Sequence, residues 1–80
     1  MPSACILIRT SSGRYKDVCE AVKKLKGVVR VFPVLGRFDV VADVEFEDPK
    51  ALAALVRRIG RLGGVAFTET LVEMEGVKPW

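Results

Sequence analysis

The chain has 80 residues, which is enough for one small domain and too few for two. It contains no histidine, and its two cysteines lack a C-x-x-C spacing, which excludes a cysteine or cysteine–histidine metal site and argues against a disulfide scaffold. Its 13 basic and 10 acidic residues leave a net charge of +3, a balance that does not by itself indicate nucleic-acid binding.

Apolar residues make up 50% of the chain, a high fraction for a short domain. No apolar run is long enough to cross a bilayer, and the first residues lack the basic and apolar regions of a signal peptide. We therefore expect a cytoplasmic protein with reduced cysteines, no membrane association and no cofactor. A domain of this size often needs disulfides, metals or partner subunits for stability, and here association is the remaining route.

The first part of the chain predicts a strand followed by a helix. Ala4 to Ile8 is apolar and contains β-branched residues, which is typical of a strand. Ser11 to Gly13 predicts a turn that caps the next helix. From Arg14 to Lys26 apolar residues recur every three or four positions, so this segment predicts an amphipathic helix that ends at Gly27. Lysines in its last turn complement the helix dipole, and a solvated helix end explains them better than phosphate binding does.

Two strands follow and form a predicted hairpin. Val28 to Leu35 is the second strand, in which Pro33 cannot donate a hydrogen bond and so favours an edge position. Phe38 to Phe46 alternates apolar and polar residues and predicts a third strand with one fully apolar face.

The last part predicts a helix and a fourth strand. Asp48 is placed to cap the helix, with Pro49 at its first position. Apolar residues at helical spacing continue to Leu62, where two glycines end the helix. Val65 to Met74 predicts the fourth strand, and residues 76–80 form a tail without an assignment.

An internal repeat supports this parse. Leu25-Lys26-Gly27-Val28 and Leu62-Gly63-Gly64-Val65 end the two helices and begin the next strands in the same way. Two such βαβ units predict an α+β, ferredoxin-like βαββαβ fold, a four-stranded antiparallel sheet with both helices on one face. Residues 1–80 then form a single domain.

The other face of this sheet should be uncovered and therefore polar, but the predicted strands do not provide a polar face. The first, second and fourth strands carry apolar residues at successive positions, so several apolar side chains are left over. Exposing them would forgo several kcal/mol at roughly 25 cal/mol per Å². We therefore expect the sheet to pair with a second copy, giving at least a homodimer.

The hairpin turn Gly36-Arg37-Phe38-Asp39 places a glycine, an aromatic ring and a carboxylate together. These are parts of a small recognition site, although glycine with a short polar residue is also ordinary turn chemistry.

Several segments, taken in order, resemble the effector-binding (RAM) domain of Lrp/AsnC transcription regulators. They are residues 25–31, the Gly-x-aromatic-Asp hairpin with its following strand at 36–44, Gly63-Gly64-Val65, and Thr68-Glu69-Thr70. The resemblance spans Ala4 to Met74.

The resemblance implies dimers that pair through their sheets and assemble into tetramers, octamers or rings. It also implies that small effectors, typically amino acids, bind between dimers at the turn between the second and third strands. Carried onto this chain, the ligand-binding residues are Gly36, Arg37, Phe38, Asp39, Thr68 and Thr70. Backbone amides near Gly36 can hold a carboxylate, Asp39 can accept from an ammonium group, and a threonine hydroxyl can do either.

The chain also departs from the family pattern. Full-length regulators carry an N-terminal helix-turn-helix domain, whereas here a strand begins near Met1, so we expect a stand-alone RAM protein without direct DNA binding. Phe38 stands where the family usually has tyrosine, and Arg37 adds a cation that favours a ligand with extra negative charge.

These observations favour a non-catalytic, oligomeric sensing module for an amino acid or similar effector, which acts alone or modulates a full-length Lrp/AsnC regulator. The alternative is a small ferredoxin-like dimeric enzyme of the isomerase or oxygenase type. Against it, the strands carry no histidine and no evident acid–base pair. A nucleic-acid-binding sheet is less favoured still, because the polar positions of the first and third strands carry no aromatic residues for base stacking.

Overall fold

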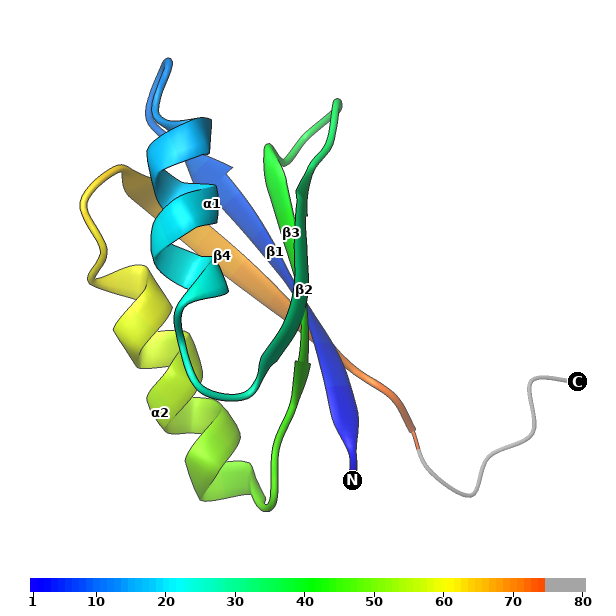
Figure 1. Ribbon diagram of the computed structural model, residues 1–80. Helices are drawn as coiled ribbons and strands as arrows, with labels where there is room; N and C mark the ends of the chain where they lie inside the picture. Colours follow the sequence, from blue (N-terminus) through cyan, green and yellow to red (C-terminus); the bar gives the residue numbers. More distant parts are fainter. Residues whose placement is uncertain (75–80) are drawn as a thin grey trace, which may run out of the picture.

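The computed structural model describes residues 1–74 of the chain. Six elements follow one another in βαββαβ order, as predicted (Figure 1). They are β1 (Ser3–Thr10), α1 (Tyr15–Lys23), β2 (Val28–Pro33), β3 (Val40–Glu45), α2 (Pro49–Gly60) and β4 (Val65–Val72).

The strands form one antiparallel sheet in the order β2-β3-β1-β4. Both helices lie on the same side of it (Figure 1). The ferredoxin-like fold predicted from the sequence is therefore confirmed. β2 is an edge strand, so Pro33 at its end, which has no backbone N–H, does not interrupt the hydrogen bonds in the centre of the sheet.

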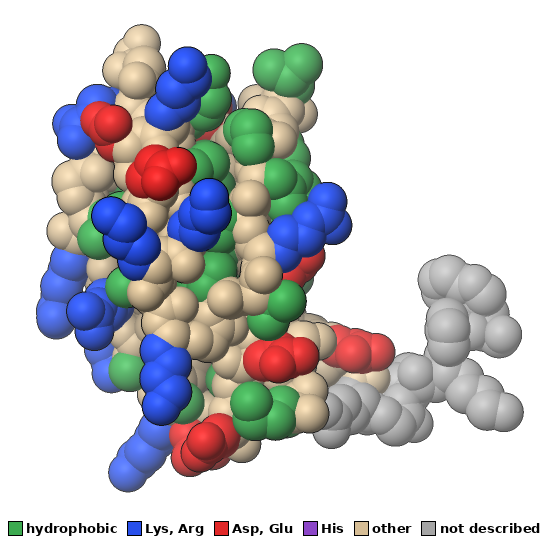
Figure 2. All heavy atoms as spheres, viewed as in Figure 1, with side chains coloured by type: hydrophobic (Ala, Val, Ile, Leu, Met, Phe, Trp, Pro, Cys, Tyr) green, Lys and Arg blue, Asp and Glu red, His purple; other side chains and the backbone are tan. Residues whose placement is uncertain are grey.

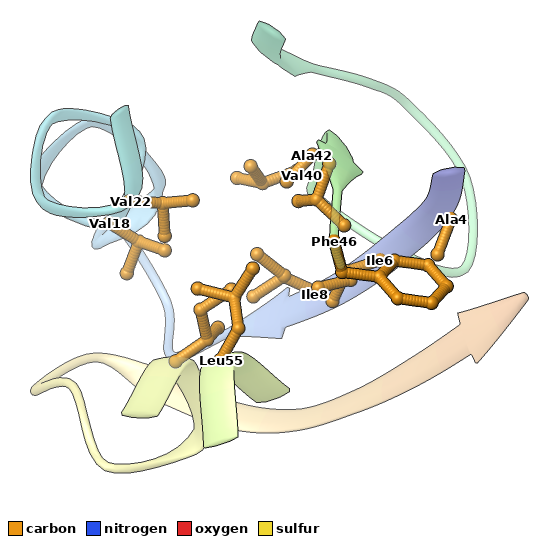
Figure 3. Close-up of a cluster of buried hydrophobic side chains, with 11 residues drawn as sticks. Ala4, Ile6, Ile8, Val18, Val22, Val40, Ala42, Phe46 and Leu55 are labelled. Atoms are coloured by element: carbon orange, nitrogen blue, oxygen red, sulfur yellow. The ribbon is translucent and has the colours of Figure 1, made fainter. Parts of the chain in front are cut away.

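The core lies between the sheet and the helices. In β1 and β3 alternate residues are buried, and the register pairs Ile6 with Ala42 and Ile8 with Val40. Valines of α1 and the apolar stripe of α2 pack on these side chains (Figure 3). The core side chains are Ala4, Ile6, Ile8, Val18, Val22, Val40, Ala42, Val44, Phe46, Leu55 and Ile59.

The two helices begin in different ways. Asp48 caps α2 as predicted, since its Oδ1 accepts a hydrogen bond of 2.8 Å from the Ala51 amide and Pro49 occupies the first turn. The predicted cap of α1 at residues 11–13 is wrong. Its N-cap is Arg14, which makes no side-chain capping bond, and a backbone bond of 3.0 Å from the Arg14 amide to the Ser11 carbonyl shapes the turn instead.

Both hairpin strands are shorter than expected. β2 ends at Pro33 and β3 begins at Val40, because the last cross-strand bond joins the Val34 amide to the Asp39 carbonyl at 2.8 Å. Helix α1 also ends earlier than predicted, at Lys23. The chain then turns at Gly27, whose φ is +95° and whose α-carbon approaches the Glu45 carbonyl so closely that a β-carbon would lie 3.0 Å from that oxygen.

The uncovered face of the sheet carries apolar side chains at its centre. Leu7 lies between Val41 on β3 and Glu69 on β4, and Cys5 lies beside Leu71. Phe67 is 57% exposed and Leu71 52% exposed. Neither helix within residues 1–74 combines the length and apolar character needed to cross a membrane.

Candidate ligand-binding site

The turn between β2 and β3 is held by backbone bonds at its base. The Val34 amide donates to the Asp39 carbonyl, and the Asp39 amide donates to the Ile8 carbonyl of β1 at 2.9 Å. Gly36 has a φ of +132°, while a β-carbon there would meet no atom within 4 Å. A glycine is therefore favoured at position 36 by the backbone conformation and not by a lack of room for a side chain.

Asp39 joins the turn to the end of β1. Its Oδ2 accepts from the Thr10 amide at 2.8 Å and from the Thr10 hydroxyl at 3.0 Å, and Arg9 Nε lies 3.9 Å away. The backbone N–H of Thr10 is the main cause that lowers the pKa of Asp39; partial burial opposes it, and the Thr10 hydroxyl and Arg9 add to it. The group is a carboxylate at neutral pH. Within residues 1–74 its Oδ1 has no hydrogen-bond partner, so one acceptor oxygen is available to a ligand.

Arg37 and Phe38 are engaged differently from Asp39. The Arg37 carbonyl accepts from Arg9 Nη1 at 3.0 Å, while the exposed Arg37 guanidinium has no ion-pair partner in the described part of the chain. The Phe38 ring packs edge-to-face on Phe67 of β4, with centroids 5.9 Å apart and planes at 70°.

A hollow of about 500 Å³ lies beside the turn. Its lining residues are Tyr15, Pro33, Val34, Leu35 and Asp39. Among the described residues, Asp39 is thus the single carboxylate of an otherwise largely apolar wall. Tyr15 was not predicted as a site residue, because its spacing placed it on the apolar face of the predicted helix. In the structure it is 40% exposed at the start of α1.

Thr68 and Thr70 lie elsewhere in the subunit. They pair with Ile8 and Ile6 of β1, so β1 separates them from the turn, and strand spacing puts Thr68 roughly 10 Å from Asp39. Like the buried Ile6 and Ile8, they lie on the helix-covered side of the sheet. Thr70 Oγ1 is buried without a hydrogen-bond partner among the described residues, and it borders a second hollow of about 520 Å³ against α2. Within one chain the structure therefore brings Gly36 to Asp39 together but does not add the two threonines.

The two cysteines lack thiolate character. Partial burial is the main cause that raises the pKa of Cys5, and the Asp43 carboxylate adds to it. Burial also raises the pKa of Cys19, with Glu20 adding to the effect and Lys23 opposing it. Both thiols are protonated at neutral pH, which makes them weak nucleophiles. Among residues 1–74, no three His, Cys, Asp or Glu side chains are grouped to hold a metal ion.

The sequence profile of the Lrp/AsnC ligand binding domain matches residues 3–79, nearly the entire chain. The chain belongs to the Lrp/AsnC ligand-binding domain family. This confirms the resemblance seen in the sequence and identifies a regulatory effector-binding module, which is a non-enzymatic class of domain.

Solved structures agree with this membership. TTHA0845 from Thermus thermophilus is 35% identical, with a TM-score of 0.90 over 98% of this Lrp/AsnC domain and 99% of that chain. The transcriptional regulator NMB0573 from Neisseria meningitidis, solved as an L-Met complex, has a TM-score of 0.81 at 20% identity, over 96% of this chain and 52% of its own. At that identity the likeness shows the fold alone.

Among curated proteins, the HTH-type transcriptional regulator FL11 of Pyrococcus furiosus is 26% identical over 72 residues, which cover 90% of this chain and 48% of FL11. The Lrp/AsnC domain described here thus spans about half the length of the curated relatives it matches.

Proposed function

We propose that this Lrp/AsnC domain is a non-catalytic sensor that binds an amino acid, or a similar small zwitterion, at the turn between β2 and β3. The observation that carries the proposal is the Asp39 carboxylate, whose Oδ2 is used by Thr10 while Oδ1 has no partner within residues 1–74. It lines a hollow whose volume is large enough for a small effector.

The chemistry of the turn matches both ends of an amino acid. Asp39 Oδ1 would accept from the ligand ammonium, and Pro33, Val34 and Leu35 would contact an apolar side chain. The Gly36 amide and the Arg37 guanidinium would donate to the ligand carboxylate, and Phe38 would hold the turn against β4. The L-Met complex of NMB0573 supports an amino acid as the ligand class, since that regulator contains a domain of this fold.

The site is completed by a second subunit in this proposal. Dimers would form through the uncovered face of the sheet, where Phe67 and Leu71 are half exposed, and dimers would associate into larger assemblies. Thr68 and Thr70 lie on the helix-covered side of the sheet, so they would contribute to a ligand site only through contacts between dimers.

A thermal-shift screen of the twenty amino acids tests the binding site. We expect one or a few amino acids to raise the melting temperature in a concentration-dependent way, without turnover. Asp39→Asn is the informative variant, because the amide oxygen can still accept from Thr10 while the negative charge is lost. We expect it to abolish the shift. Asp17→Asn removes the same charge from the exposed side of α1 and should retain the ligand-induced shift in melting temperature.

The site assignment fails if Asp39→Asn responds to the effector as the parent does, or if both variants lose the response together. The regulator partnership is tested separately by mixing the chain with a full-length Lrp/AsnC protein from the same cell. Mixed assemblies in native mass spectrometry support it, and only separate assemblies argue for a sensor that acts alone.

A further inference from the structure

Folding separates charges that are interleaved along the sequence. The helical segments 14–26 and 48–61 carry nine Lys or Arg and three Asp or Glu, a formal charge of +6. The other described residues carry three Lys or Arg and six Asp or Glu, a formal charge of −3. Figure 2 shows the resulting concentration of basic side chains over α1 and α2. The net charge of +3 is therefore the sum of a basic helical part and an acidic remainder of the chain.

The cations of the helical side are accessible. All nine are exposed, and among them only Arg14 has an ion-pair partner within residues 1–74, Asp17 at 3.3 Å. We call this surface the basic helical layer. Its members are Arg14, Lys16, Lys23, Lys24, Lys26, Lys50, Arg57, Arg58 and Arg61.

The start of α1 and the end of α2 meet at one end of the basic helical layer. The Arg14 side chain lies against Gly63 and Gly64. A β-carbon added at Gly63 would be 3.6 Å from Arg14 Nη2, and one added at Gly64 would be 3.1 Å from Arg14 Cβ. This contact places the first residues of α1 beside the segment that follows α2. Arg61, the C-cap of α2 two residues before Gly63, therefore lies at the same end of the helical side as the start of α1, while Arg57 borders the hollow between α2 and β4.

We propose that the basic helical layer binds the phosphate backbone of duplex DNA without sequence preference. This departs from the expectations, drawn from the sequence, of no direct DNA binding and of a merely solvated lysine cluster at the end of α1. Nine exposed cations on the helical side, eight of them without an ion-pair partner within residues 1–74, in a domain of isoelectric point about 9.1, match the electrostatic footprint of a nucleic-acid-binding surface. Tyr15 is the one aromatic residue on the two helices, so the layer lacks the row of rings that single strands use for stacking, which favours a duplex. A dimer paired through the sheets would leave the layer uncovered on each subunit.

Fluorescence anisotropy with two labelled DNA duplexes of unrelated sequence tests the proposal, with salt varied between about 50 and 200 mM. We expect equal affinity for both duplexes and a logarithm of the binding constant that falls linearly with the logarithm of salt. Arg58→Gln should reduce the slope by about 1 and the double variant Arg57→Gln, Arg58→Gln by about 2. The matching Arg57→Lys, Arg58→Lys variant keeps the charges and should retain binding.

Arg30→Gln is the matched control, because it removes the same charge from β2, where Arg30 stacks over the Phe32 ring on the other side of the sheet. Equal losses for Arg30→Gln and Arg58→Gln would show that net charge acts, and would overturn the proposal. So would the absence of binding at about 50 mM salt. Polyglutamate that binds as tightly as DNA would also overturn it and assign the layer to an acidic protein. Circular dichroism establishes that each variant is folded.

Discussion

At the scale of single residues, Asp39 serves the fold and the proposed site at once. One carboxylate oxygen ties the turn to Thr10, and the other has no partner within the described residues. Sequence reasoning predicted an ammonium acceptor at this position but not the bond to Thr10. The bond depends on the meeting of the turn with the end of β1, 29 positions away, which local sequence patterns do not encode.

The lowered pKa of Asp39 makes a prediction about acid stability. A carboxyl whose pKa is lower in the folded state stabilises the fold above its unfolded pKa of about 3.9, and this contribution is lost as the pH falls through the folded pKa. Asp39→Asn does not titrate. We therefore expect the parent to exceed the variant in melting temperature at pH 7, and the difference to shrink as the pH falls below about 4.

Melting curves of both proteins between pH 7 and strongly acidic conditions check this expectation. The two proteins differ only at position 39, so the effects of acid on the rest of the chain cancel in the difference. A difference in melting temperature that stays constant over this range would contradict the assigned role of the Asp39 charge.

At the scale of elements, two features that depend on neighbouring residues were predicted correctly. The period-two alternation of β3 and the Asp48-Pro49 start of α2 are properties of neighbouring residues, and both are confirmed. The start of α1 was predicted wrongly because a serine-rich turn resembles a cap, whereas the structure uses a backbone bond there. The placement of Thr68 and Thr70 follows from the register between β4 and β1, and both faces of β4 mix polar and apolar residues, so the sequence alone did not indicate which face is covered.

The contrast between the two helix starts can be measured. Asp48→Ala removes the side-chain acceptor of the Ala51 amide and should lower the free energy of unfolding by about 1 kcal/mol. Ser11→Ala should change it by less than about 0.5 kcal/mol, since that side chain does not cap α1. Urea unfolding at neutral pH gives both values. If Ser11→Ala lowered the free energy of unfolding as much as Asp48→Ala does, Ser11 would cap α1, contrary to the structure.

At the scale of the whole molecule, the sheet has apolar side chains on both faces and helices on one. Leu7, Val41, Phe67 and Leu71 remain on the uncovered face. Burying them against a second copy would gain several kcal/mol at roughly 25 cal/mol per Å², a large part of the stability of a small domain. A contribution of Thr68 and Thr70 to the proposed effector site would need a further association between dimers, because both lie on the helix-covered side of the sheet and do not meet the turn within one subunit.

Sedimentation equilibrium of the purified chain tests this account most directly. We predict a mass of at least twice the 8.8 kDa of one chain. Leu71→Lys would place an unpaired charge in the interface and should give a folded monomer, because Leu71 is 52% exposed in the single subunit. Ala54→Lys adds the same charge to the exposed side of α2 and should leave the assembly intact. A well-folded parent chain that sediments at 8.8 kDa at high concentration would contradict the account.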